Sequence, residues 1–144
     1  MSRKAIIALA AMLLAGAAQA NDVGEGPTGT AVVIAPESGV YTCAAPNPDA
    51  AFACARKKCR DAGEGDCYRT NWCFPGRWGA VYSVRTAEFH GPDALCGAPS
   101  REQALATVES WCRAQEFVVS CYVSKILTPE GVEEDADEEF SFER

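Results

Sequence analysis

Cysteine is the residue type that dominates the possible chemistry of this sequence of 144 residues. Six of its eight cysteines fall into two similar sets, which are Cys43, Cys59 and Cys67 in the first and Cys96, Cys112 and Cys121 in the second. In each set the first two cysteines are 16 positions apart, and the third follows after a short gap. Cys54 and Cys73 occur in the first half only. In a small chain this density predicts disulfides and an oxidising compartment, here in two copies of one disulfide-linked module.

The expected secondary structure suggests two of the pairings. Cys59 falls at the end of an expected helix and Cys67 at the start of the strand that follows. Cys112 and Cys121 stand in the same relation in the second half. A helix end lies close to the strand it leads into, so we predict the bridges Cys59–Cys67 and Cys112–Cys121.

The other four cysteines allow only a weaker argument. Cys43 and Cys96 occupy equivalent positions on the two return strands, so a pseudo-twofold packing of the halves would bring them together. Cys54 and Cys73 would then form a bridge within the first half, from helix to strand.

Metal binding and thiol redox chemistry would use the same cysteines, but the cysteine spacing fits these two roles less well than it fits disulfides. The closest spacings are Cys54-x4-Cys59 and Cys67-x5-Cys73, whereas zinc sites usually have closer cysteine pairs, often with histidine. The C-x-x-C spacing of thiol redox enzymes is absent from the sequence. We therefore expect no metal, no cofactor and no catalytic cysteine.

His90 is the only histidine, and its Gly-Pro neighbours predict a loop. Ser83, Glu88 and Asp93 are close in sequence but form no known nucleophile motif. We interpret His90 as a solvated loop residue, and an enzyme that uses His90 with a nearby carboxylate is the alternative.

Two other clusters are candidate partner sites. Trp72, Phe74 and Trp78 surround a Pro-Gly turn where the halves join, and they form either the core of that junction or an exposed patch for a partner. Four basic residues between 56 and 60 form either a landing site for an anionic partner or a solvated helix end; they are Arg56, Lys57, Lys58 and Arg60.

The beginning and the end of the chain differ in composition from the body. Residues 1–20 have the basic start, short apolar run and small-residue cleavage site of a signal peptide, which predicts a periplasmic or secreted protein with no membrane span after cleavage. Residues 21–28 read as a flexible leader. Residues 129–144 contain eight acids and predict an acidic, disordered tail. With 20 acids against 13 bases, the chain is a poor partner for nucleic acid.

Hydrophobic patterning divides the remainder into two units, 29–76 and 77–128. Each is expected to contain a hairpin, a capped helix and a further strand. In the first unit these are Thr30–Ala35, Val40–Ala44, a helix from Asn47 to about Arg60, and Asp66–Phe74; in the second they are Gly79–Val84, Thr86–Leu95, a helix after Ser100, and Phe117–Leu127. A shift of 53 residues aligns the cap residue, the apolar positions and the cysteine of the first helix with those of the second, which indicates an internal repeat. The predicted fold is α+β, two fused strand-strand-helix-strand units with mainly antiparallel pairing.

The second unit also resembles a known family. Trp78-Gly79-Ala80-Val81, then Ser83, a hairpin, a capped helix and a cysteine-bearing strand, is similar to the exported bacterial domain-of-unknown-function 4189 family. In the first unit, Ala35-Pro36-Glu37-Ser38-Gly39 looks like the same hairpin turn, although the Trp-Gly-Ala opening is absent. The resemblance implies export and a small α+β module, and it implies no activity or catalytic residue.

These observations favour an exported, disulfide-rich, non-enzymatic binding or structural module of the bacterial envelope, with an unknown protein partner. Two alternatives stay open at this point. One is a proteinaceous inhibitor of a basic hydrolase such as lysozyme, because opposite charge speeds encounter. The other is the small enzyme that uses His90.

Overall fold

The structure is a computed structural model that describes residues 26–143. Within this range the chain forms seven strands and two helices. In chain order they are β1 (Gly29–Ala35), β2 (Gly39–Ala45), α1 (Pro48–Asp61), β3 (Tyr68–Cys73), β4 (Trp78–Thr86), β5 (His90–Ala98), α2 (Arg101–Ala114), β6 (Val118–Leu127) and β7 (Glu133–Ser141). The predicted signal peptide and most of the predicted leader lie outside the described residues.

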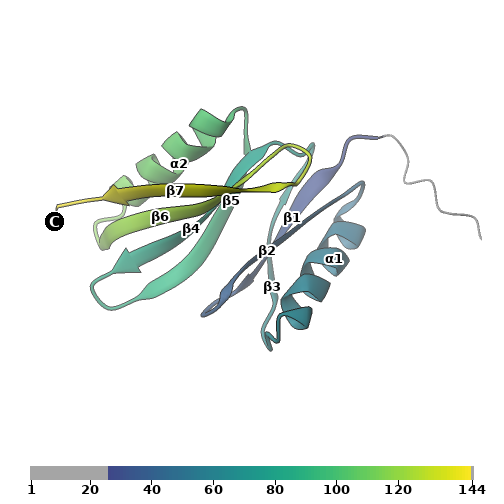
Figure 1. The fold of residues 1–144 in the computed structure, drawn as a ribbon, viewed down its shortest axis with the longest axis horizontal. Helices are drawn as coiled ribbons and strands as arrows, with labels where there is room; N and C mark the ends of the chain where they lie inside the picture. Colours follow the sequence, from purple (N-terminus) through teal and green to yellow (C-terminus); the bar gives the residue numbers. More distant parts are fainter. Residues whose placement is uncertain (1–25, 144) are drawn as a thin grey trace, which may run out of the picture.

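The strands form two antiparallel sheets, each with one helix packed on it (Figure 1). The first sheet has the order β2-β1-β3 and is covered by α1. The second has the order β5-β4-β6-β7 and is covered by α2. The predicted α+β class, with two strand-strand-helix-strand units, is therefore confirmed.

The two units correspond closely in their helices. Both helices have 14 residues, and α2 begins and ends 53 positions after α1. Asn47 caps α1 by accepting a hydrogen bond from the Ala50 amide at 2.9 Å, and Ser100 caps α2 by accepting one from the Gln103 amide at 3.1 Å. Equivalent strands also take equivalent places in the two sheets. Descent of the two units from one ancestral copy stays a prediction.

Each unit has its own core between sheet and helix. In the first, Ala31, Val33 and Ala35 of β1 meet Ala51, Phe52, Ala55 and Cys59 of α1. In the second, the packed residues of β4, α2 and β6 are Ala80, Tyr82, Val84, Val108, Cys112, Val118, Cys121, Val123 and Ile126. The first core consists largely of alanine and buries little apolar area, which increases its dependence on disulfides.

The first sheet also contributes to the junction between the units. Alternation along the strands directs Thr30 and Val32 of β1, and Thr42 of β2, away from α1, and all three are buried. The first sheet contacts β5 of the second sheet, and the Asn71 side-chain amide donates to the Ala94 carbonyl at 3.0 Å. The layers therefore follow the order α1, first sheet, second sheet, α2 (Figure 1).

Four disulfides join all eight cysteines. The predicted bridges Cys59–Cys67 and Cys112–Cys121 are confirmed, with Cα atoms 6.2 Å and 6.4 Å apart. The predicted bridges Cys43–Cys96 and Cys54–Cys73 are wrong. Cys43 instead pairs with Cys54 at a Cα separation of 5.9 Å, and Cys73 pairs with Cys96 at 6.0 Å.

The wrong prediction assumed that the equivalent cysteines Cys43 and Cys96 face equivalent sides of their sheets, and a bulge in β5 breaks this equivalence. Trp78 lies opposite Ala98 but Gly79 lies opposite Cys96, so Gly97, with a φ of 101°, is an extra residue in β5. An extra residue moves the next side chain to the other face of the sheet. Cys43 consequently faces α1 and meets its cysteine, whereas Cys96 faces away from α2 and meets Cys73 of the other unit.

Residues 129–144, which were predicted to be a disordered acidic tail, instead form largely a strand. β7 pairs antiparallel with β6 along Glu133–Ser141. A tight turn precedes it, in which the Gly131 amide donates to the Thr128 carbonyl and the Thr128 amide donates to the Val132 carbonyl, each at 2.9 Å. The acid run has little apolar periodicity of its own, and the backbone of β6 supplies its hydrogen bonds.

The disulfide pattern is testable by a tryptic digest of the oxidised protein. Cys43 and Cys54 both precede Arg56, so trypsin leaves them in the same peptide. Their bridge is then internal to that peptide and joins it to no other peptide. The peptide from Thr70 to Arg77 is expected to be joined to the peptide from Thr86 to Arg101 through the bridge between the units. Mass spectrometry that finds the peptide ending at Arg56 joined to another peptide contradicts this arrangement.

Tyr82 provides a test of the second core. Its ring is 4% exposed and its hydroxyl donates to Asp93 at 3.1 Å. Burial, followed by the Asp93 charge, raises the pKa of Tyr82 above its usual 10, so the stabilisation is fully present below about pH 10 and is lost at higher pH. We expect Tyr82→Phe to lower the free energy of unfolding by about 1 kcal/mol at pH 7.

The same variant should show a smaller loss of stability between pH 9 and pH 11 than the wild type, measured by urea unfolding. Tyr68→Phe is the matched control, because Tyr68 is 54% exposed. An equal loss in wild type and Tyr82→Phe would contradict a role for the Tyr82 phenol.

Candidate functional site

The face of the second sheet opposite α2 is the strongest candidate surface. On β4, Ala80, Tyr82 and Val84 pack toward α2, so the alternate residues Ser83 and Arg85 project to the other side. No helix of the described chain covers that side. The first sheet packs against its β5 end, and the turn between β1 and β2 overhangs a further part, while the region around Ser83, Arg85 and His90 stays exposed. A surface between the two units is thus open to a partner.

Two adjoining concave regions lie on this face. The hairpin groove, of about 390 Å³, lies between the turn at 37–40 and the sheet, where its wall includes Val81, Ser83, His90, Pro92, Lys125 and Glu133. The sheet depression, of about 340 Å³, is lined by Ser83, Arg85, His90, Ser120, Tyr122 and Glu139. Both include Ser83 and His90, so a single polar surface runs from the first unit to β7.

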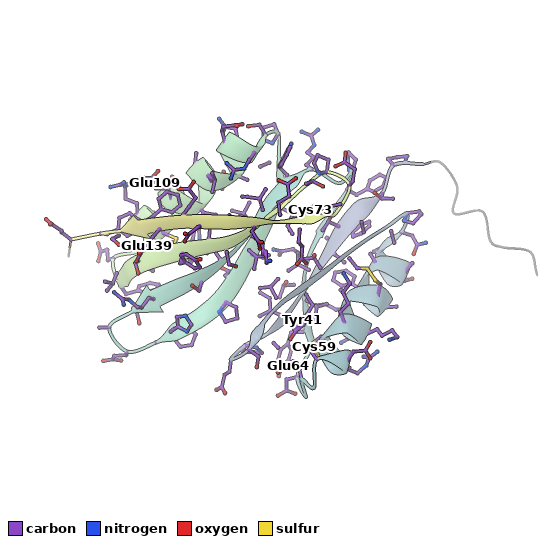
Figure 2. All side chains as sticks on the ribbon, viewed as in Figure 1. Tyr41, Cys59, Glu64, Cys73, Glu109 and Glu139 are labelled. Atoms are coloured by element: carbon purple, nitrogen blue, oxygen red, sulfur yellow. A yellow bond between two sulfur atoms is a disulfide. The ribbon has the colours of Figure 1, made fainter. Side chains whose placement is uncertain are left out.

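The carboxylates of β7 form the border of this surface. Glu133, Asp135, Asp137 and Glu139 alternate along the strand on the side of Lys125 and Tyr122 (Figure 2 labels Glu139). The Thr42 hydroxyl donates to Glu133 at 2.6 Å, which ties β7 to β2 of the first unit. Lys125 forms an ion pair with Asp135, its cross-strand neighbour.

Contacts with β6 also shift the ionisation of these groups. The hydrogen bond and charge of Asp135 raise the pKa of Lys125, and the same hydrogen bond and charge lower the pKa of Asp135. A hydrogen bond with Asp137 raises the pKa of Tyr122. These groups are exposed, so their contribution to stability is small. Their contacts hold two carboxylates in place above β6.

The opposite side of β7 provides apolar contacts. Ala136 and Phe140 pack against the core of the second unit, and they alternate with Glu134 and Glu138 along this side of the strand. In total six of the nine residues of β7 are acidic. β7 is therefore a strongly negative strand that is ordered by its contacts with the sheet.

His90 is the first residue of β5 rather than part of a loop, and its side chain is exposed. It lies opposite Arg85 on β4 and shares the sheet depression with Ser83 and Glu139. Within residues 26–143, no hydrogen bond or ion pair joins the His90 side chain to either of them. The alternative of an enzyme that uses His90 stays a prediction.

The three aromatic residues at the junction have different roles. Trp72 packs against the first core and Trp78 against the second, and both are half-buried. Phe74 is 53% exposed and stacks on Trp72 with ring centroids 6.1 Å apart. Trp72 and Trp78 therefore contribute to packing, Phe74 is the most exposed of the three, and a partner patch at these residues stays a prediction.

Three of the four basic residues of α1 contact their own unit. The Lys58 ammonium donates to the Thr42 carbonyl at 2.8 Å, and Lys57 pairs with Asp61. The Arg56 guanidinium donates to the Cys67 carbonyl at 3.4 Å. These contacts favour the interpretation of the basic cluster as a helix surface.

A third concave region, of about 410 Å³, lies in the first unit beside Glu37, Glu64 and Asp66. Tyr41 donates to Glu64 at its border, at 3.3 Å (Figure 2). Among residues 26–143, no three acidic, histidine or cysteine side chains are grouped so that they could hold a metal ion. None of the helices in the same range is long and apolar enough to cross a membrane.

Comparisons with known protein families, with curated proteins and with solved structures find no match for this chain. The resemblance to the domain-of-unknown-function 4189 family rests on the residues quoted above and stays a prediction.

Sequence reasoning missed β7, although one local signal pointed to it. Thr128-Pro129-Glu130-Gly131 has the proline and glycine of a tight turn and directly follows a strand. Such a turn predicts a returning strand, and the charge of the following residues obscured that prediction.

Gly131 provides a test of how β7 is held. Its φ is 79°, and a Cβ at this position would lie 2.5 Å from the Ala44 Cβ. We expect Gly131→Val to destabilise the turn by about 1–3 kcal/mol and to speed hydrogen exchange in β7. Gly63→Val is the matched control, because Gly63 also has a positive φ but no neighbour within 4 Å of the added Cβ. Unchanged exchange in β7 for Gly131→Val would contradict this role.

Proposed function

We propose that this protein is an exported, non-enzymatic binding module of the bacterial envelope, and that it binds a cationic protein partner through β7 and the adjoining face of the second sheet. The observation that carries the proposal is β7. Six carboxylates are held in two rows on an ordered strand beside the exposed part of the sheet face.

The scaffold supports this proposal. The described part of the chain is short and contains four disulfides, and such a density of disulfides is typical of proteins in oxidising compartments. The bridge Cys73–Cys96 connects the two units, and Thr42 of the first unit contacts Glu133 of β7. The position of the charged strand is thereby coupled to both units. A surface that is held in place loses less conformational entropy when it binds.

Inhibition of a basic hydrolase, such as lysozyme, is a specific form of this function. A flexible acidic tail would give general attraction, whereas an ordered row of acids matches a defined pattern of cations. Oriented charge of this kind raises association rates by about 10- to 1,000-fold at low salt. The order of β7 therefore favours the inhibitor over a role limited to solubility.

The proposal is tested with the charge-neutral β7 variant, in which four acids are replaced by their amides: Glu133→Gln, Asp135→Asn, Asp137→Asn and Glu139→Gln. Removing residues 130–144 is less informative, because it also exposes β6. The matched control neutralises four exposed acids elsewhere: Asp49→Asn, Asp66→Asn, Glu88→Gln and Glu116→Gln.

We expect the wild type and the control to bind a cationic envelope protein, and the charge-neutral β7 variant to bind it at least tenfold more weakly at low salt. Affinity capture from envelope extract followed by surface plasmon resonance measures this difference. A lysozyme activity assay tests the inhibitor. Equal binding by both variants, or no specific partner, contradicts the proposed function.

A further inference from the structure

The outer edge of β7 has no strand against it in the described part of the chain. The second sheet ends at β7, whose inner edge pairs with β6. In an antiparallel strand, alternate residues direct their amide and carbonyl groups to each edge. β7 has nine residues and contains neither proline nor glycine, so each of its residues has a backbone amide donor, and its register with β6 shifts by one residue between Asp135 and Glu138. Such an edge is a template for a further strand.

The other end of the same sheet differs. β5 contacts the strands of the first sheet and includes Pro92, which has no amide hydrogen. Strand addition to the second sheet is therefore favoured at β7 over β5.

The charge of β7 excludes a second copy of the chain from this edge. Two copies of β7 side by side would bring two sets of six carboxylates within cross-strand distance. Like charges directly opposite one another in a sheet are destabilising. The same charges therefore prevent self-association and restrict the edge to a strand of opposite charge.

β6 shows how a lysine on a neighbouring strand can pair with β7. Lys125 lies directly opposite Asp135 in the antiparallel register, and the two side chains form an ion pair. A strand on the outer edge could repeat this arrangement. Lysine or arginine at alternate positions would then lie beside the row of Glu133, Asp135, Asp137 and Glu139.

We propose that β7 binds an extended segment of a partner protein that carries lysine or arginine at alternate positions, and that this segment adds to the second sheet as a fifth strand. Main-chain hydrogen bonds provide affinity, and the alternating cations provide selectivity. The inference rests on the proposed binding function and specifies how the partner docks.

The test uses the full mature protein in its oxidised form and three capped peptides of nine residues. The first peptide alternates lysine and threonine. The second has the same sequence with N-methyl groups on three consecutive central amides, which keeps the charge but removes donors on both edges. The third alternates glutamate and threonine. Calorimetry at low salt measures binding, and hydrogen exchange measures protection of the β7 amides.

We expect the lysine–threonine peptide to bind at least tenfold more tightly than its N-methylated form and to protect alternate amides of β7. The glutamate–threonine peptide should not bind. Binding to the charge-neutral β7 variant should fall at least tenfold, whereas the control variant defined above should bind as the wild type does. Equal affinity for the two lysine peptides, absence of β7 protection, or no binding of any peptide would overturn strand addition.

These outcomes separate the two proposals. If a natural partner binds in a manner that depends on the β7 carboxylates but the peptides show no strand addition, the binding function stands and the docking mode is wrong. If the natural partner is indifferent to those carboxylates, the proposed function itself fails.

Discussion

The pairing of β7 with β6 is the interaction on which the candidate surface depends. Neighbouring carboxylates on one side of β7 are about 7 Å apart, and in water each such pair repels by about 0.6 kcal/mol before salt screening. The backbone hydrogen bonds to β6, the packing of Ala136 and Phe140, and the ion pair of Lys125 oppose this repulsion. Because the repulsion is small and screened, a sheet partner is sufficient to order a strand that has six acids in nine residues.

A single extra residue in β5 has a similarly large influence on the disulfide pattern. The bulge at Gly97 turns Cys96 away from its own helix, so that this cysteine joins the two units instead of stapling one of them. The first unit contains Cys43 at the equivalent position but has no such bulge in β2, and Cys43 accordingly reaches α1. Two units with the same order of elements thus acquire different bridges, and the difference holds them together.

The arrangement of charge gives the molecule two distinct surfaces. Three of the four basic residues of α1 contact the first unit, whereas the acids of β7 border the exposed part of a sheet face. His90 and Arg85 lie on that face beside the carboxylates, so the surface is not uniformly negative. A partner therefore meets charges of both signs in fixed positions on a sheet that is linked to both units. This arrangement favours recognition of a particular surface over general attraction to cations.

Local chemistry in the sequence determined the two helices with their caps at Asn47 and Ser100, the strands of both units, and the bridges Cys59–Cys67 and Cys112–Cys121. Each of these depends on residues close together in the chain, where periodicity, capping and short loops restrict the backbone. Only the tertiary structure decided the order of β7, the bridges Cys43–Cys54 and Cys73–Cys96, and the groove between the units. The order of β7 needs the backbone of β6 as a hydrogen-bonding partner. The two bridges and the groove depend on which face of a bulged strand each residue occupies and on the stacking of two sheets, and no local pattern of side chains encodes either.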